Sequence, residues 1–562
     1  MVFVSVSKTL TLAALAALAL ASPATPIADA ASVSSLPTVL NCVHRALREQ
    51  GSVNLIVTMK AGTEDVLSGH AAATPEGQDA SRRGEQIESL VSRLEANAKE
   101  SQAKLLESLQ NAKTQDGQPL FGESQSYWIS NQIFFKDASP ELVEKLSAMP
   151  SVQEIRQEKV IEISATQQNG AASLRAGNAS DAAAADAVEW NIRKVGAPDV
   201  WARGYRGEGV VVGIIDTGAR ATHEALRDSY RGDYGWFDPV EGKAEPYDPH
   251  GHGSHVVGTV AGSHGVGVAP GAKWMACRGC ADRKCDERHL LKCAEFMMCP
   301  TDPQGNKRDC TKAPRVINNS WAMKGSFFDQ SIRTWRAAGI IPVFGVGNLC
   351  FGCASAAYPS HLRDVIAVGA TDDKDGLMIG SCKGPSPTGL VKPDLAAPGV
   401  NIRSVSPESD TAYTARVGSS MASPHVAGAI ALMLNRFPRG TYDQVLKELR
   451  RTAATQSLQP TGYECGGTPD TVFPNNQYGS GRLSVANAMG LPVKDEKPSQ
   501  TINPCTPLPD RFCTEAAKCQ WNPNKGRRGT CELRETAPTP NPTPSPTPKP
   551  RPQSDDDRPI WS

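Results

Sequence analysis

Residues 210–220 read VVVGIIDTGAR, a run of β-branched residues that ends on Asp216 and turns at Gly218. Buried parallel strands are continuous apolar runs of this kind, and α/β sheets place their functional groups at the carboxyl ends of such strands. The stretch therefore predicts a buried strand of an α/β sheet that delivers the Asp216 carboxylate to a site. Alone it is a weak signal, because an aspartate at a strand end is more often a turn residue or a cap.

A second segment with candidate chemistry is HGHGSHVVGTVAG, residues 250–262. His252 stands at the start of a run of small residues that predicts a closely packed helix. The histidine could act as a base, could be a buried structural residue, or could form half of a metal pair with His250 or His255. No cysteine or carboxylate stands at the spacing of a zinc-protease helix, which disfavours the metal.

A third segment, GSSMASPHVAGAIALML at residues 418–434, places Ser420 at the start of a long apolar helix with Pro424 near its first turn. A serine at such a position is usually only a helix cap. Between the second and third segments, PVFGVGN at residues 342–348 predicts another buried strand that ends on Asn348.

The order Asp216, His252, Ser420 is one of the three chain orders known for hydrolytic triads, and it is the order of subtilisin. The four segments resemble the signature segments of the subtilisin-like (S8) serine proteases. The likeness runs from about Trp190 to Met489 and includes VINNSW, YPSHLRDVIAVGATD and KPDLAAPGVNI. VINNSWAMKGS, SCKGPSP and KPDLAAPGVNIRS are most similar to the bacillopeptidase F branch of the family.

The resemblance implies a catalytic role for each matched residue. His252 would be the general base, Asp216 would hold its imidazole in the required tautomer, and Ser420 would be the nucleophile that forms an acyl-enzyme. Asn348 matches the side-chain donor of the family's oxyanion hole, which it forms with the backbone N–H of Ser420.

The resemblance also implies where a substrate binds. Ser320, Trp321 and Ala322 match the segment that pairs with an extended substrate as an added strand, with side chains that border the specificity pockets. Ala357 matches the base of the main pocket. Neither it nor its two neighbours carries a carboxylate, which favours apolar rather than basic residues at the cleaved position and disfavours a kexin-like processing protease.

The fold class implied by the resemblance is α/β: a three-layer α/β/α domain with a mostly parallel sheet. Ahead of it, VNLIVTMK, a charged amphipathic stretch, WISNQIFFKD, ASPELVEKLSAMPSV and KVIEIS follow one another between residues 50 and 165. This β-α-β-α-β order predicts a small α+β domain. Its position and element order resemble the inhibitor-type propeptide of the family.

Composition and the resemblance together divide the chain into six parts. The apolar run TLTLAALAALAL, residues 9–20, whose last two residues form the cleavage site Ala19-Leu20-Ala21 with the next one, predicts a secretory signal. Small polar residues without a core pattern predict an exposed linker, and alternating prolines predict an extended spacer at the end. The predicted parts are 1–21, signal peptide; 22–165, propeptide; 166–187, linker with the processing site; 188–490, peptidase domain; 500–535, four-cysteine segment; and 537–562, Pro/Thr-rich tail.

The cysteines have the distribution of a secreted protein. Of 15 cysteines, ten lie between Cys277 and Cys465, four lie between Cys505 and Cys531, and Cys42 stands alone. Six of the ten fall in residues 277–310, a region that is usually free of cysteine in the family. Export implies an oxidising compartment, so disulfides are favoured over zinc, although the spacing does not give their pairing.

Composition disfavours nucleic acid and membrane as partners. Lys+Arg and Asp+Glu both number 59, so net charge gives no reason to expect nucleic-acid binding. No long apolar run follows the N-terminal one, so we expect no membrane span. The predicted signal indicates a secreted, extracellular protein, and we expect it to be a monomer. The expected partners are protein substrates and the chain's own propeptide, acting as an inhibitor.

No cofactor is expected to be required. Calcium is possible as a structural ion at an unknown site, because VAGSHGVGVAP is too short for the usual strong calcium loop of the family. The alternative to an enzyme is a catalytically inactive relative that binds through its C-terminal module.

Overall fold

The computed structural model describes residues 37–73, 82–163, 187–322, 325, 327–462, 464–491, 519–522 and 530–533. The predicted signal peptide and Pro/Thr-rich tail, and all of the predicted linker except residue 187, lie outside the described residues. Within the four-cysteine segment only an antiparallel pair of strands is described, β19 (Cys519–Asn522) and β20 (Thr530–Leu533). No helix among the described residues is both long and apolar enough to cross a membrane.

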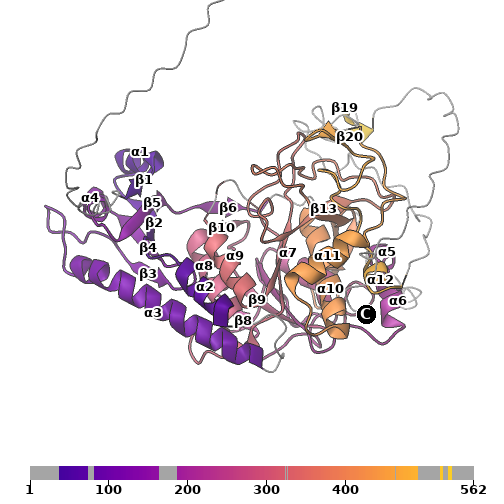
Figure 1. Cartoon of the computed structure of the whole chain (residues 1–562), viewed down its shortest axis with the longest axis horizontal. Helices are drawn as coiled ribbons and strands as arrows, with labels where there is room; N and C mark the ends of the chain where they lie inside the picture. The colour runs from indigo at the N-terminus through magenta and orange to yellow at the C-terminus, as the bar shows by residue number, and fades with distance from the viewer. Residues whose placement is uncertain are drawn as a thin grey trace, which may run out of the picture.

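A seven-stranded sheet forms the centre of the large domain (Figure 1). Every neighbouring pair in it is parallel, which confirms the predicted parallel α/β sheet. In spatial order the strands are β14 (Leu395–Pro398), β13 (Ile366–Thr371), β12 (Ile341–Gly345), β11 (Val316–Asn319), β7 (Val211–Asp216), β9 (Lys273–Arg278) and β8 (Trp236–Phe237).

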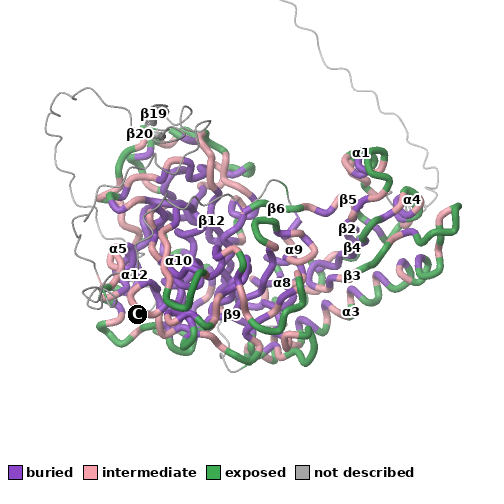
Figure 2. The backbone as a smooth tube through the Cα atoms, turned by 180° about the vertical axis from the view of Figure 1, so that it is seen from behind, coloured by how far each residue is buried: buried purple, intermediate pink, exposed green. Residues whose placement is uncertain are grey.

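Helices cover both faces of this sheet. Ile214 of β7 packs into one apolar cluster and the next residue, Ile215, into another, because successive side chains of a strand point to opposite faces. The first cluster includes residues of α5 (Trp190–Lys194), α6 (Ala197–Trp201), α7 (His252–Ala261), α10 (Ser419–Arg436), α11 (Tyr442–Arg451) and α12 (Val485–Ala488). The second includes residues of α8 (Glu287–Met298) and α9 (Asp329–Ala337). The three-layer α/β/α fold is therefore confirmed, and Figure 2 shows buried residues gathered in the interior of the large domain.

Shorter elements complete the large domain. A one-turn helix, η2, spans Cys310–Lys312. The antiparallel pairs are β15 (Ile402–Val405) with β16 (Tyr413–Arg416) and β17 (Glu464–Cys465) with β18 (Thr468–Pro469).

The N-terminal domain is a smaller α+β unit with a core of its own. Its sheet has the order β1-β5-β2-β4-β3, and only the β1–β5 pair is parallel. The strands are β1 (Thr38–Val39), β2 (Val53–Met59), β3 (Ser124–Tyr127), β4 (Gln132–Ala138) and β5 (Val152–Gln157). The helices are α1 (Asn41–Gln50), α2 (Glu64–Ala73), α3 (Arg83–Leu109) and α4 (Pro140–Ser147). The element order is richer than β-α-β-α-β, since β1, α1, α2, β3 and β5 add to it.

The last predicted strand of the small domain lies elsewhere. KVIEIS contributes β6 (Val160–Glu162), which pairs antiparallel with β10 (Lys284–Asp286) of the large domain and not with the N-terminal sheet. Ile161 and Ile163 explain this position, because both side chains are buried in the second apolar cluster, which contains residues of both domains. The chain of the small domain thus ends as an added strand on the large one.

Ten cysteines form five disulfides in the large domain. Three lie within the cysteine-rich insertion, which we define as residues 277–310, and two connect loops farther along the chain. The pairs are Cys277–Cys293, Cys280–Cys285, Cys299–Cys310, Cys350–Cys382 and Cys353–Cys465. Cys42 is a free cysteine.

We predict that these ten cysteines contain no free thiol in the folded protein, because each has a partner sulfur within bonding distance. Non-reducing peptide mapping by mass spectrometry should recover the five linked pairs, and elemental analysis should find no stoichiometric zinc. An alkylated cysteine among the ten, or one equivalent of zinc, would contradict the assignment.

Candidate active site

Three side chains expected to form the site come from the carboxyl edge of neighbouring strands. Asp216 ends β7, Ser320 follows β11, and Asn348 lies shortly after β12. These strands are adjacent in the order β12-β11-β7, so their carboxyl ends meet at one edge, where α/β sheets hold their sites.

Asp216 is buried and fixed by the turn that follows it. Its Oδ1 atom accepts a hydrogen bond of 2.8 Å from the backbone N–H of Thr217. Gly218 has φ of +124°, and a Cβ there would lie 2.0 Å from the carbonyl oxygen of Tyr247. Only glycine fits this turn, so the Asp-Thr-Gly sequence places the carboxylate in one orientation.

His252 is the first residue of α7 and binds Asp216 directly. Its Nδ1–H donates to Oδ1 of Asp216 at 2.7 Å, and both side chains are buried. The helix start can come this close because Gly253 has no side chain: a Cβ there would lie 2.1 Å from the carbonyl oxygen of Gly218. Since Nδ1 carries the proton, Nε2 has a free lone pair, and it makes no hydrogen bond to any described residue.

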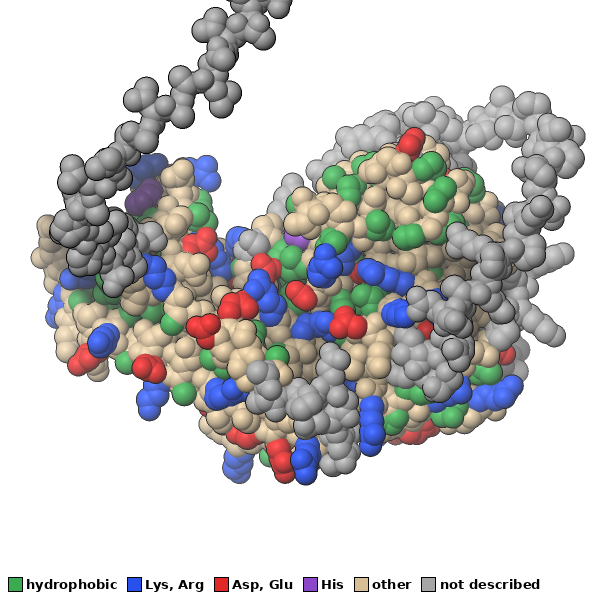
Figure 3. Space-filling view, in the orientation of Figure 1, with side chains coloured by type: hydrophobic (Ala, Val, Ile, Leu, Met, Phe, Trp, Pro, Cys, Tyr) green, Lys and Arg blue, Asp and Glu red, His purple; other side chains and the backbone are tan. Residues whose placement is uncertain are grey.

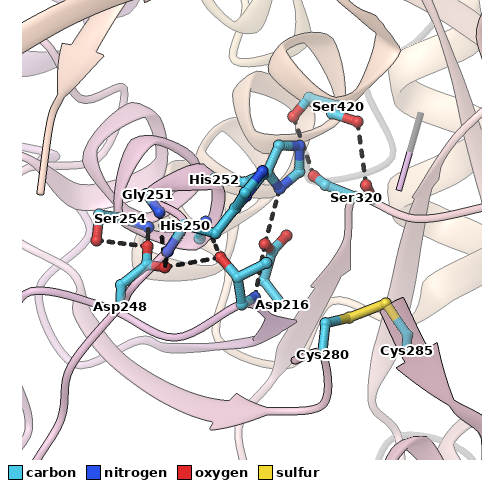
Figure 4. A network of polar contacts seen from close by, with 12 residues as sticks. Asp216, Asp248, His250, Gly251, His252, Ser254, Cys280, Cys285, Ser320 and Ser420 are labelled. Atoms are coloured by element: carbon cyan, nitrogen blue, oxygen red, sulfur yellow. Dashed lines mark hydrogen bonds and ion pairs between the residues drawn. A yellow bond between two sulfur atoms is a disulfide. The ribbon is translucent and has the colours of Figure 1, made fainter. Parts of the chain in front are cut away.

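Asp248 is a site residue that sequence reasoning missed. Its buried carboxylate accepts hydrogen bonds around the start of α7, from the backbone N–H groups of His250, Gly251 and Ser254 and the hydroxyls of Ser254 and Thr217 (Figure 4). A carboxylate at a helix N-terminus satisfies free N–H groups and opposes the positive end of the helix dipole. Asp248 therefore positions the turn that carries His252. Its position in the sequence, four residues before His252, could have pointed to it.

The two other histidines of the motif have separate roles. Burial lowers the pKa of His255 well below its ordinary value, and its Nε2–H donates to the carbonyl of Ile402 at 2.8 Å. Burial, followed by the nearby His252, lowers the pKa of His250. Both are therefore neutral near pH 7, and neither has a described contact that would make it a metal partner of His252.

Ser420 lies in the first turn of α10 and is not its cap. The N-cap position is Gly418, which has no side chain to cap with. The hydroxyl of Ser420 donates instead to the carbonyl of Ser320 at 3.0 Å. Figure 4 shows the imidazole of His252 between Asp216 and Ser420, so β7, α7 and α10 bring the three side chains together.

Asn348 is oriented by the same helix start. Its Oδ1 atom accepts a hydrogen bond of 2.8 Å from the backbone N–H of Ser419. Because the oxygen is held there, the amide nitrogen on the opposite side of the group is left to donate. The backbone N–H of Ser420 is one of the helix N–H groups without an intrahelical partner. Two donors of this kind can stabilise a developing oxyanion.

The segment expected to bind substrate differs in detail from its sequence interpretation. The Ser320 hydroxyl contacts the carbonyl of Ser420 and the hydroxyl of Ser423, both at 3.0 Å, so this side chain points to α10 and not toward a specificity pocket. Trp321 is buried in the apolar cluster that also holds Ile161 and Ile163. Its ring packs edge-on against Phe328 and Phe344.

The last two predicted substrate residues, Ala322 and Ala357, are half-buried. The backbone N–H of Ala357 donates to Val346 at 3.0 Å, which places Ala357 beside the strand end that carries Asn348. Its methyl group would be 3.0 Å from a Cβ on Gly347.

Metal ligands are not gathered at this site. Among the described residues, the one grouping of three potential ligands is Glu88, Cys299 and Cys310. Its two cysteines are bonded to each other in a disulfide, so they offer no thiolate.

The fold and the site together define the class of this protein. Residues 207–481 match the Peptidase S8 model of the subtilase family. The chain is 34% identical over 310 residues to subtilisin Savinase from Lederbergia lenta, a match that covers 54% of this chain and 99% of that protein. The chain belongs to the subtilase family, and the expected likeness to subtilisin-like serine proteases is confirmed.

Two further relatives refine the comparison. An alkaline protease from Alkalihalobacillus alcalophilus is 33% identical over 310 residues, which is 54% of this chain and 70% of that protein. Bacillopeptidase F from Bacillus subtilis (strain 168) is 35% identical over 426 residues, which is 71% of this chain. The chain spans only 28% of the length of bacillopeptidase F.

We predict that Asn348→Leu leaves the protein folded and lowers kcat for a peptide substrate by roughly 10²–10³, which is the loss known for the corresponding donor of subtilisin itself. Asn348→Asp keeps an acceptor for the Ser419 N–H but has no donor, so its loss should be at least as large. Steady-state kinetics with circular dichroism as the folding check measure both. Wild-type kcat in either variant would remove Asn348 from the site.

Proposed function

We propose that the chain is a secreted serine endopeptidase that hydrolyses peptide bonds in proteins through an acyl-enzyme and is made as a self-processing preproenzyme. The observation that carries the proposal is the buried hydrogen bond between Asp216 and His252, with Nε2 of His252 unoccupied and Ser420 on its far side.

The mechanism follows from the tautomer of His252. With Nδ1–H bound to Asp216, Nε2 accepts the Ser420 proton as the hydroxyl attacks the substrate carbonyl. The hydroxyl donates to Ser320 in this structure, so it first rotates about its Cα–Cβ bond toward Nε2. Asp216 stabilises the resulting imidazolium, which then protonates the leaving amine. Water repeats the sequence on the acyl-enzyme.

The oxyanion formed in each step would lie between the side-chain amide of Asn348 and the backbone N–H of Ser420. Both donors are fixed before the reaction, one through Ser419 and one by the helix, so no reorganisation opposes charge development. Ala357 near the same strand end favours apolar side chains at the cleaved residue.

The N-terminal domain is proposed to be the chain's own propeptide and inhibitor. Its last described strand, β6, pairs with β10 as an added strand, and the Ile163 N–H donates to the carbonyl of Arg283 at 2.8 Å. Ile161 and Ile163 share a buried cluster with Trp321, which belongs to the expected substrate segment. A docked β6 would exclude any substrate strand that pairs with β10.

Charged contacts between the domains support a specific complex. The guanidinium of Arg156 donates to both carboxylate oxygens of Glu287, and this pair is almost completely buried. Burial alone would lower the pKa of Arg156, but the Glu287 carboxylate more than offsets it, so the pKa is raised. The N–H of Trp128 donates to Glu295 of α8 at 2.8 Å. Elsewhere on the face drawn in Figure 3, acidic and basic side chains are interspersed without a large patch of one sign.

We predict that the wild-type chain cuts itself between about Ile163 and Glu189, and that Ser420→Ala remains an uncut, inactive precursor. The linker belongs to the same chain as the site, so its effective concentration there is high. Intact mass and N-terminal sequencing of both proteins, expressed without other proteases, measure this. Hydrolysis of casein by Ser420→Ala at the wild-type rate would refute the triad. Trimming of Ser420→Ala at the same bond would refute self-maturation.

We predict that Glu287→Gln weakens retention of the cleaved N-terminal domain, because Arg156 would remain charged and buried without its partner. Breaking a buried pair costs about 3–5 kcal/mol, so dissociation should be faster by roughly 10²–10⁴ if the loss falls mainly on the off-rate. Two measurements report this dissociation. One is the lag between processing and the appearance of activity, and the other is gel filtration of the processed protein.

The matched control is Glu64→Gln, which removes the Glu64–Arg333 pair across the same interface. Both of its side chains are about half exposed. Exposed pairs contribute about 0–1 kcal/mol, so the lag should change little. Equal lags in the two variants would show that the buried pair does not hold the domain.

A further inference from the structure

The loop that follows Asn348 is not held by core packing. Residues 352–354 are exposed, residues 349–351 and 355–357 are half-buried, and the loop contains no helix or strand. Leu349 has φ of +61°, a left-handed conformation that is unfavourable for a leucine. Such a backbone persists only where other contacts determine it.

Those contacts come from a disulfide beside Asn348. Cys350 is bonded to Cys382, and the two sulfur atoms lie 3.6 and 3.7 Å from the carbonyl oxygen of Asn348. The Cys350 N–H also donates to the carbonyl of Gly380 at 3.0 Å. The loop is therefore attached to residues 380–382 by one covalent bond and one backbone hydrogen bond.

The same disulfide touches the backbone on the other side of Asn348. The N–H of Cys382 donates to the carbonyl of Gly347 at 3.2 Å. Gly347 has φ of +107°, and a Cβ there would lie 2.8 Å from Sγ of Cys382. The disulfide thus lies against the peptide groups before and after Asn348.

A buried ammonium group makes a second connection between the two segments. Nζ of Lys383 lies 3.4 Å from the carbonyl oxygens of Cys350 and Ser381. Burial lowers the pKa of Lys383 to about 8. Its backbone carbonyl also accepts the N–H of Ser355 at 2.7 Å, so the segments run together along several residues.

We propose that the Cys350–Cys382 disulfide is a positioning element for Asn348, one that aligns its amide with the developing oxyanion. Asn348 then has two anchors: Ser419 holds the side-chain oxygen, and the disulfide holds the backbone. This inference rests on the proposed function, because it assigns the disulfide to the oxyanion step of the same reaction. Opening the disulfide leaves the side-chain anchor but frees the backbone that carries it.

The direct test is the full-length variant Cys350→Ser/Cys382→Ser, allowed to mature. A misplacement of about 1 Å costs up to about a hundredfold in rate, so kcat should fall by roughly ten- to a hundredfold while KM changes little. A peptidyl boronate, whose tetrahedral adduct places an oxygen in the oxyanion hole, should lose affinity in parallel with kcat.

The matched control is Cys353→Ser/Cys465→Ser, which opens the other disulfide of the same loop. Its sulfur atoms have no described contact with Asn348, and it closes a longer stretch of chain, with a sequence separation of 112 against 32. If the disulfides only stabilised the fold, this control would lower kcat as much as the test variant. We expect it to retain kcat within about threefold while losing thermal stability.

A double-mutant cycle with Asn348→Leu decides between positioning and general damage. When the donor is already absent, opening Cys350–Cys382 should change kcat less than about twofold. An undiminished loss in that background, equal losses in test and control, or wild-type kcat in the test variant would each overturn the proposal. A Ser420→Ala protein that still hydrolyses substrate would instead overturn the proposed function.

If the double variant does not fold, mature wild-type enzyme can be partially reduced. Fractions alkylated only at Cys350 and Cys382, as located by mass spectrometry, then replace it in the same kinetic measurements. Full kcat in these fractions overturns the proposal, and a reduced kcat with unchanged KM supports it.

Discussion

The hydrogen bond between Asp216 and His252 exists because a strand end and a helix start meet at backbone contact. A Cβ on Gly218 or Gly253 would lie 2.0 or 2.1 Å from a carbonyl oxygen, so larger residues would push α7 away from β7. Asp248 then binds the N–H groups that this close approach leaves without partners. With the imidazole fixed, the position of Ser420 at the start of α10 determines which chemistry is possible.

The residues of the site could be predicted from sequence because each signature is local. A β-branched run that ends in Asp-Thr-Gly specifies a strand end, and His-Gly-Ser-His specifies a helix start, with glycine where the backbones touch. Each segment alone also fitted a cap or a buried structural histidine. Asp248 was missed although four of its five hydrogen bonds are to residues within six positions, because an aspartate ahead of a helix start belongs to none of the four signature segments.

The position of β6 and the disulfide pairing could not be predicted for a different reason. An alternating segment such as Val-Ile-Glu-Ile fits the edge of any sheet, and only the folded chain shows that β10 is its partner. Likewise, Cys350 joins Cys382 and not its near neighbour Cys353 because residues 380–384 run beside the loop after Asn348. Which cysteines or strands lie close enough to pair is determined by the topology of the whole domain and not by their spacing in the sequence.

The site therefore depends on two kinds of support. The proposed base and nucleophile belong to packed helices, α7 and α10, whereas the loop after Asn348 is held by a disulfide. β10 pairs with β6 along one edge, and an edge can pair with only one strand at a time. Under the proposed function, the N-terminal domain and a substrate that pairs with β10 could not be bound at the same time. Inhibition would then require no device beyond the strand pairing itself, and it would end when the domain is lost.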